Sequence, residues 1–452
     1  MPTSYVPVAS ATSDPWPPPH GAEDCGVMTV QPVVAAARSV ARRPAPLNLL
    51  VAANAISLTG NVIATVAVPW LVLTTTGSAA MAGIVVFAGA GTAAVGGLAA
   101  GRIVDAIGPT RTSAFADVLS AIAVAPLPIL LALGGLELWH VVVLAIGGTL
   151  ADSAGSTARQ ALVPAAADAC GIRRERANAM FTSAEHTGYL LGAPLAGILI
   201  GLAGIGGALL VTVAAFTFAA VLVAGLVRIQ VRVADGPGVE RIGLAAAVRF
   251  IWADPALRAL VVFPTVATML VGPLVPIVLP VMAREAFGDP LALGLMVASY
   301  GAGGLVGAVL FGSLGRRVER RLLFIGVMVG WPAVYATLAT GPSLVVTMAI
   351  LLVWGIAAGS LVPMMATIRQ ERSPANLLPR VVGLSTASVP VVGPVSVLIA
   401  GFLLEGLGVP MTLLMMTAGA AAIGIAALTS SGIRTLDLAA GGGTGAGMHR
   451  LR

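Results

Sequence analysis

Long apolar runs, each followed by a short polar or charged stretch, recur along most of the chain. A run of about 20 apolar residues is long enough, as a helix, to cross the hydrocarbon core of a membrane. The pattern therefore predicts an all-α polytopic membrane protein. We expect twelve transmembrane helices, at residues 48–74, 80–100, 112–134, 138–161, 178–202, 206–228, 257–283, 291–314, 322–340, 344–368, 381–404 and 409–430.

The composition agrees with this pattern. Of the 452 residues, 58% are hydrophobic and 10% are charged, whereas a soluble globular domain carries about 25% charged residues. The net charge of +6 comes from arginines that gather in every second connection, as in 173–176 and 316–321. Such clusters hold loops on the cytoplasmic side. We therefore expect a monomer in the plasma membrane, surrounded by lipid, with both termini cytoplasmic and no nucleic-acid partner.

The chain divides into two similar halves. Gly96 and Gly101, before the first charged turn, are matched by Gly307 and Gly312 before a second one. A weak repeat of six helices is typical of a two-lobed transporter with its substrate between the lobes. The expected organisation is a disordered cytoplasmic N-terminal tail (1–46), an N-terminal six-helix lobe (47–228), a cytoplasmic linker (229–255), a C-terminal six-helix lobe (256–431) and a cytoplasmic C-terminal tail (432–452).

A short charged turn lies between the second and third spans. It follows the pattern G-x-x-x-D-x-x-G with a basic residue after it, and it resembles the loop 2–3 signature of the major facilitator superfamily. In that family the loop acts as a latch on one conformational state, so the resemblance implies the major facilitator fold and a gating role. The gating candidates are Gly101, Asp105, Gly108, Arg111 and Arg159, the last as a partner for Asp105 or Asp117.

The fifth span carries small residues and a proline, at Gly188, Gly192, Pro194 and Gly197. This segment resembles the antiporter signature G-P-x-x-G-G of proton-coupled exporters, although Pro194 is displaced by one position. Glycines let a neighbouring helix approach closely, and a proline can bend a helix. The alternative to an exporter motif is plain small-residue packing.

Shorter motifs extend the resemblance over about residues 47–430. They lie at 69–78, 158–164, 176–179, 254–258 and 379–383, and they are similar to the drug:proton antiporter branch that contains macrolide, tetracycline/aminoglycoside and enterobactin exporters. The resemblance implies export of a small molecule by alternating access, with protons as the second partner. The chain has no P-loop, so ATP is not the expected energy source. We expect no cofactor, and the four histidines show no metal-site spacing.

Four ionisable side chains lie well inside the predicted spans, and all are in the first half: Asp117, Asp152, Glu185 and His186. Charge in the hydrocarbon core costs about 2.5–3.5 kcal/mol or more, so such residues are candidates for function. Asp152, Glu185 and His186 share one predicted depth and are the candidates for proton coupling. The alternative is that each is a structural hydrogen-bond or salt-bridge partner, and this is the reading that we favour for Asp117.

Polar side chains on the first span predict one wall of a substrate cavity. Asn54, Ser57, Asn61 and Thr65 form one stripe at helical spacing. In the second half, aromatic residues would suit a bulky hydrophobic ligand, and the candidates are Tyr300, Tyr335 and Trp354. The alternative is that the stripe joins helices and the aromatic residues pack in the core or face lipid.

The sequence thus favours a secondary active exporter of an amphipathic, drug-like small molecule over an enzyme. A dedicated exporter of an endogenous metabolite or siderophore is the nearest alternative. A facilitator-like importer is disfavoured by the fifth-span motif. A membrane scaffold or receptor without transport is the alternative of another class, and it would not need acids buried in one lobe.

Overall fold

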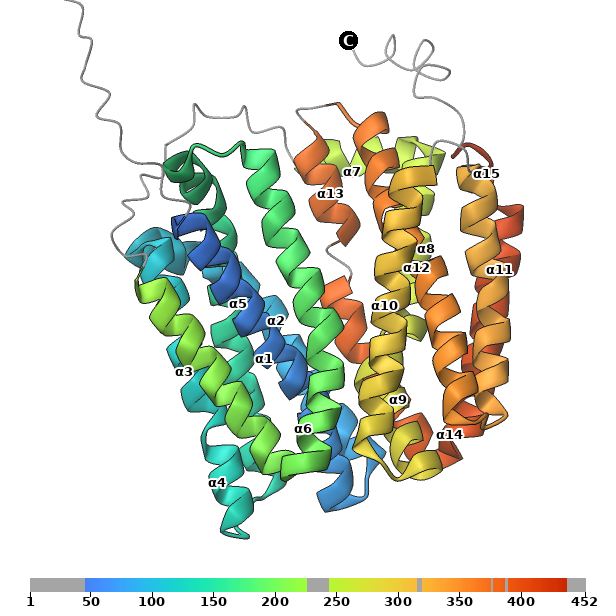
Figure 1. Cartoon of the computed structure of the whole chain (residues 1–452). Coiled ribbons are helices and arrows are strands. Elements are labelled where there is room, and N and C mark those ends of the chain that lie inside the picture. Colours follow the sequence, from blue (N-terminus) through green and yellow to red (C-terminus); the bar gives the residue numbers. More distant parts are fainter. Residues whose placement is uncertain (1–44, 226–243, 315–318, 375–376, 387–388, 437–452) are drawn as a thin grey trace, which may run out of the picture. The chain divides into compact units, whose positions relative to one another are not determined.

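The structure, a computed structural model, describes residues 45–225, 244–314, 319–374, 377–386 and 389–436 (Figure 1). The described chain consists of helices and their connections, with no strand among these residues. The predicted N-terminal tail up to residue 44, the linker up to residue 243 and the C-terminal tail from residue 437 lie outside the described residues.

The N-terminal lobe consists of six elements: α1 (Ala45–Thr76), α2 (Ala79–Ile107), α3 (Pro109–Val124), α4 (Pro126–Ala132), α5 (Leu138–Cys170) and α6 (Arg174–Ala224). Helices α3 and α4 together form the third predicted span. Helix α6 holds the fifth and sixth spans, because Gly204 has φ 72° and ψ 176° and interrupts it. Glycine adopts this positive φ without the steric cost that a side chain would bring.

The C-terminal lobe begins with an irregular span: α8 (Pro255–Val271), the π-helical η1 (Leu274–Val278), α9 (Leu279–Met282) and the π-helical η2 (Ala283–Phe287). Prolines at 264, 273, 276 and 280 remove backbone donors from this span and explain the irregularity. The lobe continues through α10 (Pro290–Leu314), α11 (Arg320–Ala339), α12 (Leu344–Arg372), α13 (Leu378–Thr386), α14 (Val389–Thr429) and α15 (Ser431–Arg434). Gly408, with φ 74°, divides α14 into the last two spans.

The twelve predicted spans are present. By length and hydropathy, nine stretches of the described chain are able to cross a membrane. Two of these, in α6 and α14, each contain a glycine break and more than one span, and α2 has a shorter apolar part, Ala79–Ala93. In the chain between the lobes, α7 (Leu244–Ala253) is a helix within the predicted linker.

The lobes contact each other through two pairs of glycines. Gly197 of α6 faces Gly294 of α10, where a Cβ on Gly197 would lie 3.1 Å from the Gly294 Cα. Gly83 of α2 faces Gly401 of α14 in the same way, because a Cβ on Gly83 would lie 3.3 Å from the Gly401 Cα. These contacts lie near the helix ends opposite to α7, and Figure 1 shows α6 and α10 side by side. The glycines let the two lobes approach to backbone contact.

The predicted charged turn between the second and third spans is shorter than expected. Helix α2 continues through Gly101 and Asp105 to Ile107, and Gly108 alone makes the turn, with φ 84°. The prediction ended the helix at residue 100 because apolar character ends there, but charged residues extend a helix readily once it has left the membrane.

Candidate functional site

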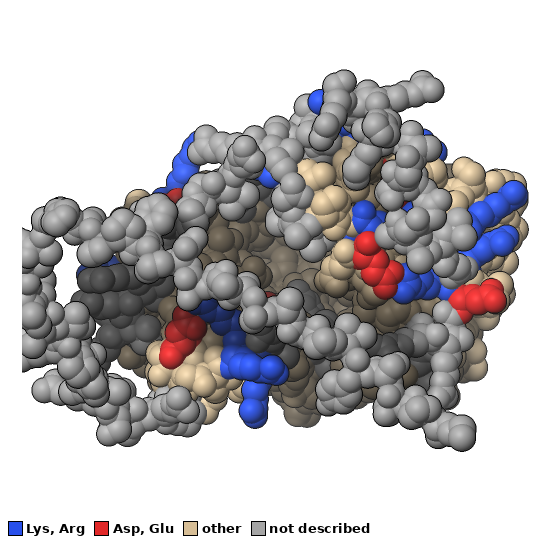
Figure 2. Space-filling model, turned by 90° about the horizontal axis from the view of Figure 1, so that it is seen from above, with Lys and Arg blue, Asp and Glu red and all other residues tan. Residues whose placement is uncertain are grey.

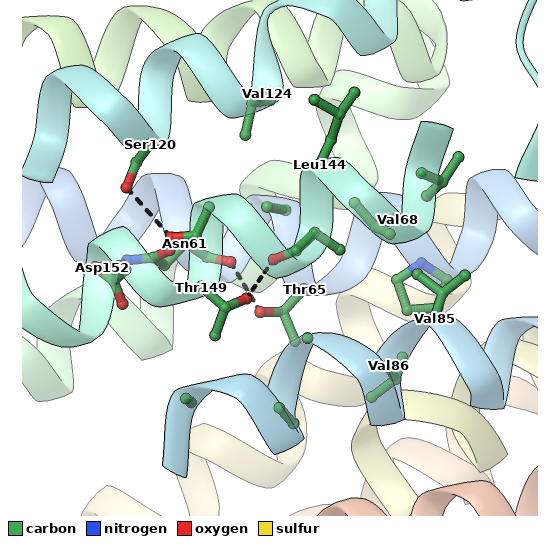
Figure 3. Close-up of a pocket in the computed structure, with 18 of the residues that line it drawn as sticks. Asn61, Thr65, Val68, Val85, Val86, Ser120, Val124, Leu144, Thr149 and Asp152 are labelled. Carbon is green, nitrogen blue, oxygen red and sulfur yellow. Dashed lines mark hydrogen bonds between the residues drawn. The ribbon is translucent and has the colours of Figure 1, made fainter. Parts of the chain in front are cut away.

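A cavity of about 520 Å³ lies inside the N-terminal lobe (Figure 3). Its walls come from α1, α2, α3, α4, α5 and the second part of α6, and most of them are apolar. Polar side chains reach it at five positions, which are Asn61, Thr65, Ser120, Thr149 and Asp152. The sequence pattern predicted Asn61 and Thr65 for a substrate cavity and Asp152 for proton coupling, but it missed Ser120 and Thr149.

Asp152 is the acidic group in the cavity wall. Its Oδ1 accepts a hydrogen bond from Asn61 Nδ2 at 2.8 Å and lies 3.5 Å from Arg159 Nη2. The side chain is 28% exposed. Helix α1 therefore orients the carboxylate through Asn61, and α5 supplies both the carboxylate and its cationic neighbour.

Arg159 and Asp117 form a second, deeper part of the same network. Arg159 Nη1 donates to both carboxylate oxygens of Asp117, at 3.0 and 3.1 Å, and each side chain is 2% exposed. Ser57 Oγ donates to Asp117 at 2.9 Å, and Arg159 Nε donates to Asn54 Oδ1 at 3.0 Å. Asp117 is thus a structural partner, as the sequence reading favoured, and Arg159 pairs with it and not with Asp105.

The network holds two carboxylates and one guanidinium. Two hydrogen bonds from Arg159 bind Asp117, whereas Asp152 lies farther from the same cation and faces the cavity. Uncompensated charge is costly in a membrane interior, so the arrangement favours one extra positive charge beside Asp152. A proton or a cationic ligand would supply it.

Glu185 does not share this cavity. It lines a separate pocket of about 410 Å³ between α5 and α6, together with Gln160, Asn178 and Thr182. The side chain of His186 lies outside the described residues. Equal depth along two helices thus does not bring Asp152 and Glu185 to the same cavity, and the role of Glu185 and His186 in proton coupling stays a prediction.

The aromatic candidates of the C-terminal lobe lie in its core. Tyr335 is fully buried and donates from its hydroxyl to the Leu270 carbonyl at 2.8 Å. Trp354 is 4% exposed, and its ring stacks on Trp331 with centroids 5.5 Å apart. Tyr300 is half-buried against the same core. Tyr335 and Trp354 therefore pack in the core of the C-terminal lobe, and their place in a substrate cavity stays a prediction.

The glycines of the predicted antiporter motif contact two different helices. A Cβ on Gly192 would lie 2.8 Å from Val62 Cβ of α1, and one on Gly188 would lie 3.3 Å from Leu58 Cδ2 of the same helix. Gly197 faces α10 of the other lobe, and Pro194 lies half-buried between these contacts. The segment therefore joins its own lobe to the opposite one.

The gating candidates on α2 and α3 are exposed. Asp105 and Arg111 both face solvent, and neither has a hydrogen bond or ion pair within the described part of the chain. A Cβ on Gly101 would meet nothing within 4 Å. A latch built from these residues is not engaged in this conformation.

Comparison with known proteins agrees with this architecture. The model of the Major Facilitator Superfamily matches residues 50–282 and 265–434. The chain is 31% identical over 401 residues to the multidrug efflux pump Tap of Mycolicibacterium fortuitum, covering 87% of this chain and 98% of that one. It is 31% identical over 404 residues to Tap of Mycobacterium tuberculosis (strain ATCC 25618 / H37Rv), covering 87% and 95%.

Solved structures show the same fold at lower identity. A bacterial homologue of the human lysosomal transporter Spinster has a TM-score of 0.68 at 14% identity, covering 88% of this chain and 98% of that one. The nucleoside transporter NupG has a TM-score of 0.66 at 12% identity, covering 85% and 98%. The protein is therefore a multi-pass membrane transporter and not an enzyme, and it belongs to the major facilitator superfamily.

Proposed function

We propose that this protein exports amphipathic, drug-like small molecules from the cytoplasm in exchange for protons. The two relatives described above, which match 87% of the chain, bear the name multidrug efflux pump. The proposal of proton coupling rests on the position of Asp152. Its carboxylate lies in a cavity wall, 3.5 Å from the buried guanidinium of Arg159.

Asp152 is the group that exchanges the proton. Asp117 is held by two hydrogen bonds from Arg159 and one from Ser57 in a fully packed site, so its charge is already balanced. Asp152 has one hydrogen bond from Asn61 and open space in front of it. Protonation cancels its charge, and loss of the proton leaves a carboxylate that attracts a substrate cation.

The direction of transport follows from the orientation of the protein in the membrane, which the arginines indicate. Figure 2 views the end of the molecule that carries α7 and α13, and positive side chains gather on this face. Exposed arginines of the N-terminal lobe include Arg102, Arg173, Arg174 and Arg176. By the positive-inside rule this face is cytoplasmic, with both termini on the same side. The glycine contacts between the lobes then lie on the extracellular side, which suits loading of substrate from the cytoplasm.

Efflux from a pump-deficient host tests the proposal. Cells loaded with ethidium or tetracycline should empty faster when they express the protein, and a protonophore should abolish the difference. Asp152→Asn should abolish proton-driven efflux, because the amide can neither exchange a proton nor attract a substrate cation. Glu285→Gln, which changes an exposed acid in η2 at the end of the seventh span, is the matched control and should behave like wild type.

Two outcomes would contradict this assignment. Proton-driven efflux that persists in Asp152→Asn would remove Asp152 from the coupling step. A well-expressed wild-type protein that moves none of a panel of drugs would instead favour a dedicated exporter of an endogenous metabolite or siderophore.

A further inference from the structure

The two lobes repeat each other closely enough to fix a residue-by-residue register. Contacts between α2 and α5 recur between α10 and α12 at constant offsets. The equivalent contacts are Gly89–Thr149 with Tyr300–Gly355, Ala93–Ser153 with Gly304–Gly359, and Gly96–Leu150 with Gly307–Ile356. Because all three pairs of contacts have the same offsets, they define a single alignment of α2 with α10 and of α5 with α12.

The same offsets place the cavity of the N-terminal lobe where the C-terminal lobe holds its aromatic core. The first residues of α3 and α11 differ in number by the same offset as the first residues of α2 and α10, so this offset also aligns α3 with α11. Ser120 then corresponds to Trp331, Val124 to Tyr335 and Gly148 to Trp354, and the first member of each pair lines the cavity. Ser120 Oγ contacts the Gly148 carbonyl at 3.4 Å, as the rings of Trp331 and Trp354 contact each other.

The N-terminal cavity is therefore the volume that two indoles and a phenol fill in the repeat. In the C-terminal lobe the two indole planes are 18° apart and the phenol of Tyr335 is inclined by 57° to Trp331, so aromatic rings fill this volume. In the N-terminal lobe small side chains leave about 520 Å³, which is within the range of drug-sized ligand sites.

The remaining polar groups of the wall do not compete for a ligand. Thr65 donates to the Asn61 carbonyl and Thr149 to the Ala145 carbonyl, each at 2.8 Å. Ser120 is turned to the backbone of α5. Asp152 supplies the carboxylate at the wall, and the charge of nearby Arg159 is matched by Asp117.

We propose that this cavity, inside one lobe, binds the planar aromatic part of an organic monocation whose charged group lies at Asp152. The site lies within the N-terminal lobe and not between the two lobes. The proposal rests on the proposed export function and names the substrate class. An apolar volume that holds aromatic rings in the repeat, with one carboxylate in its wall, selects for aromatic area and a single positive charge.

Filling the cavity is the first test. Gly148→Trp restores the side chain of the repeat, and Gly147→Trp is the matched control on the neighbouring position, which does not line the cavity. Binding of ethidium to purified protein in detergent is measured by fluorescence anisotropy. We expect Gly148→Trp to lower the affinity at least tenfold and Gly147→Trp to change it less than twofold. Wild-type affinity in Gly148→Trp, or no ethidium binding to wild type, would overturn the proposal.

Labelling of a cysteine decides the question without a bulky substitution. In a background with Cys25→Ala and Cys170→Ala, Thr65→Cys places a thiol at an exposed position of the cavity wall. Thr182→Cys places one, also at an exposed position, in the separate pocket that contains Glu185. Ethidium should slow maleimide labelling of Thr65→Cys several-fold and leave Thr182→Cys unchanged, and the reverse pattern would overturn the proposal.

These binding assays need no proton gradient, so they separate the site from the coupling. Loss of ethidium binding in Gly148→Trp supports the site even if efflux by the wild type proves insensitive to a protonophore. Proton-driven efflux of wild type, combined with protection at Thr182→Cys alone, rejects the site and leaves the export function standing.

Discussion

The two lobes share one fold, yet the N-terminal lobe holds charge and space where the C-terminal lobe is filled. In the first, α1, α3 and α5 meet around Arg159 and two aspartates beside a cavity. In the second, Trp331, Trp354 and Tyr335 occupy the equivalent volume. The comparison teaches that side-chain size at a few repeat positions decides which lobe contains a cavity and which lobe is filled.

Helix packing differs in the same direction. In the C-terminal lobe, a Cβ on Gly303 would overlap the Leu352 carbonyl oxygen across the α10–α12 contact. In the N-terminal lobe, a Cβ on Gly89 would stop 3.3 Å from Thr149 Oγ1. Backbones in direct contact leave no room for adjustment. The C-terminal lobe therefore suits rigid-body movement, while α2 and α5 of the N-terminal lobe retain some room between them.

The largest effect should come from removing the cation of the N-terminal lobe. Arg159→Ala leaves the buried carboxylate of Asp117 without its partner, and breaking such a pair costs about 3–5 kcal/mol. We expect a strong loss of folded protein, seen as a lower yield and a lower midpoint of thermal unfolding in detergent. The double variant Arg159→Met with Asp117→Asn carries no such charge and should recover most of the loss. A stable Arg159→Ala protein would show that the pair is dispensable.

A smaller effect should come from the glycine contact of the C-terminal lobe. Gly303→Ala forces α10 and α12 apart, and overpacking of this kind costs about 1–3 kcal/mol. Gly304→Ala is the matched control, because its Cβ would meet nothing within 4 Å. Thermal unfolding of both variants, with Gly89→Ala from the N-terminal lobe, measures the difference between the lobes. Equal midpoints for Gly303→Ala and Gly89→Ala would contradict it.

Most of the fold could be predicted from the sequence because each helix that spans the membrane corresponds to a long apolar run. The turns at Gly204 and Gly408 fall between predicted spans, since a glycine among short polar or small residues marks a reversal. The end of α2 could not be placed, because residues beyond the membrane surface no longer obey the apolar pattern. The irregular span after Pro255 was visible only as a set of prolines.

The candidate site was only partly predictable. Of the stripe from Asn54 to Thr65, Asn61 and Thr65 line the cavity, whereas Asn54 and Ser57 are buried in the network around Arg159 and Asp117. Its partners Asp117 and Arg159 come from two other helices, and helical spacing on one chain segment does not show which residues of another it meets. The cavity itself depends on small side chains at Ser120 and Gly148, and a packing void has no signal in hydropathy.

The smallest effect should come from the acid that joins the two lobes. Glu405 of α14 accepts hydrogen bonds from Ser78 Oγ and, at 2.8 Å, from the Ala80 amide at the N-terminus of α2. Glu405→Gln keeps an acceptor but removes the charge that favours a helix N-terminus, so the contact weakens without being lost. For spin labels at Thr76→Cys and Leu407→Cys, double electron–electron resonance should then show a larger fraction of long distances between the two labels. Asp289→Asn, which alters a cap within one lobe, should leave the distances unchanged, and an equal shift in both variants would show that Glu405 does not hold the lobes together.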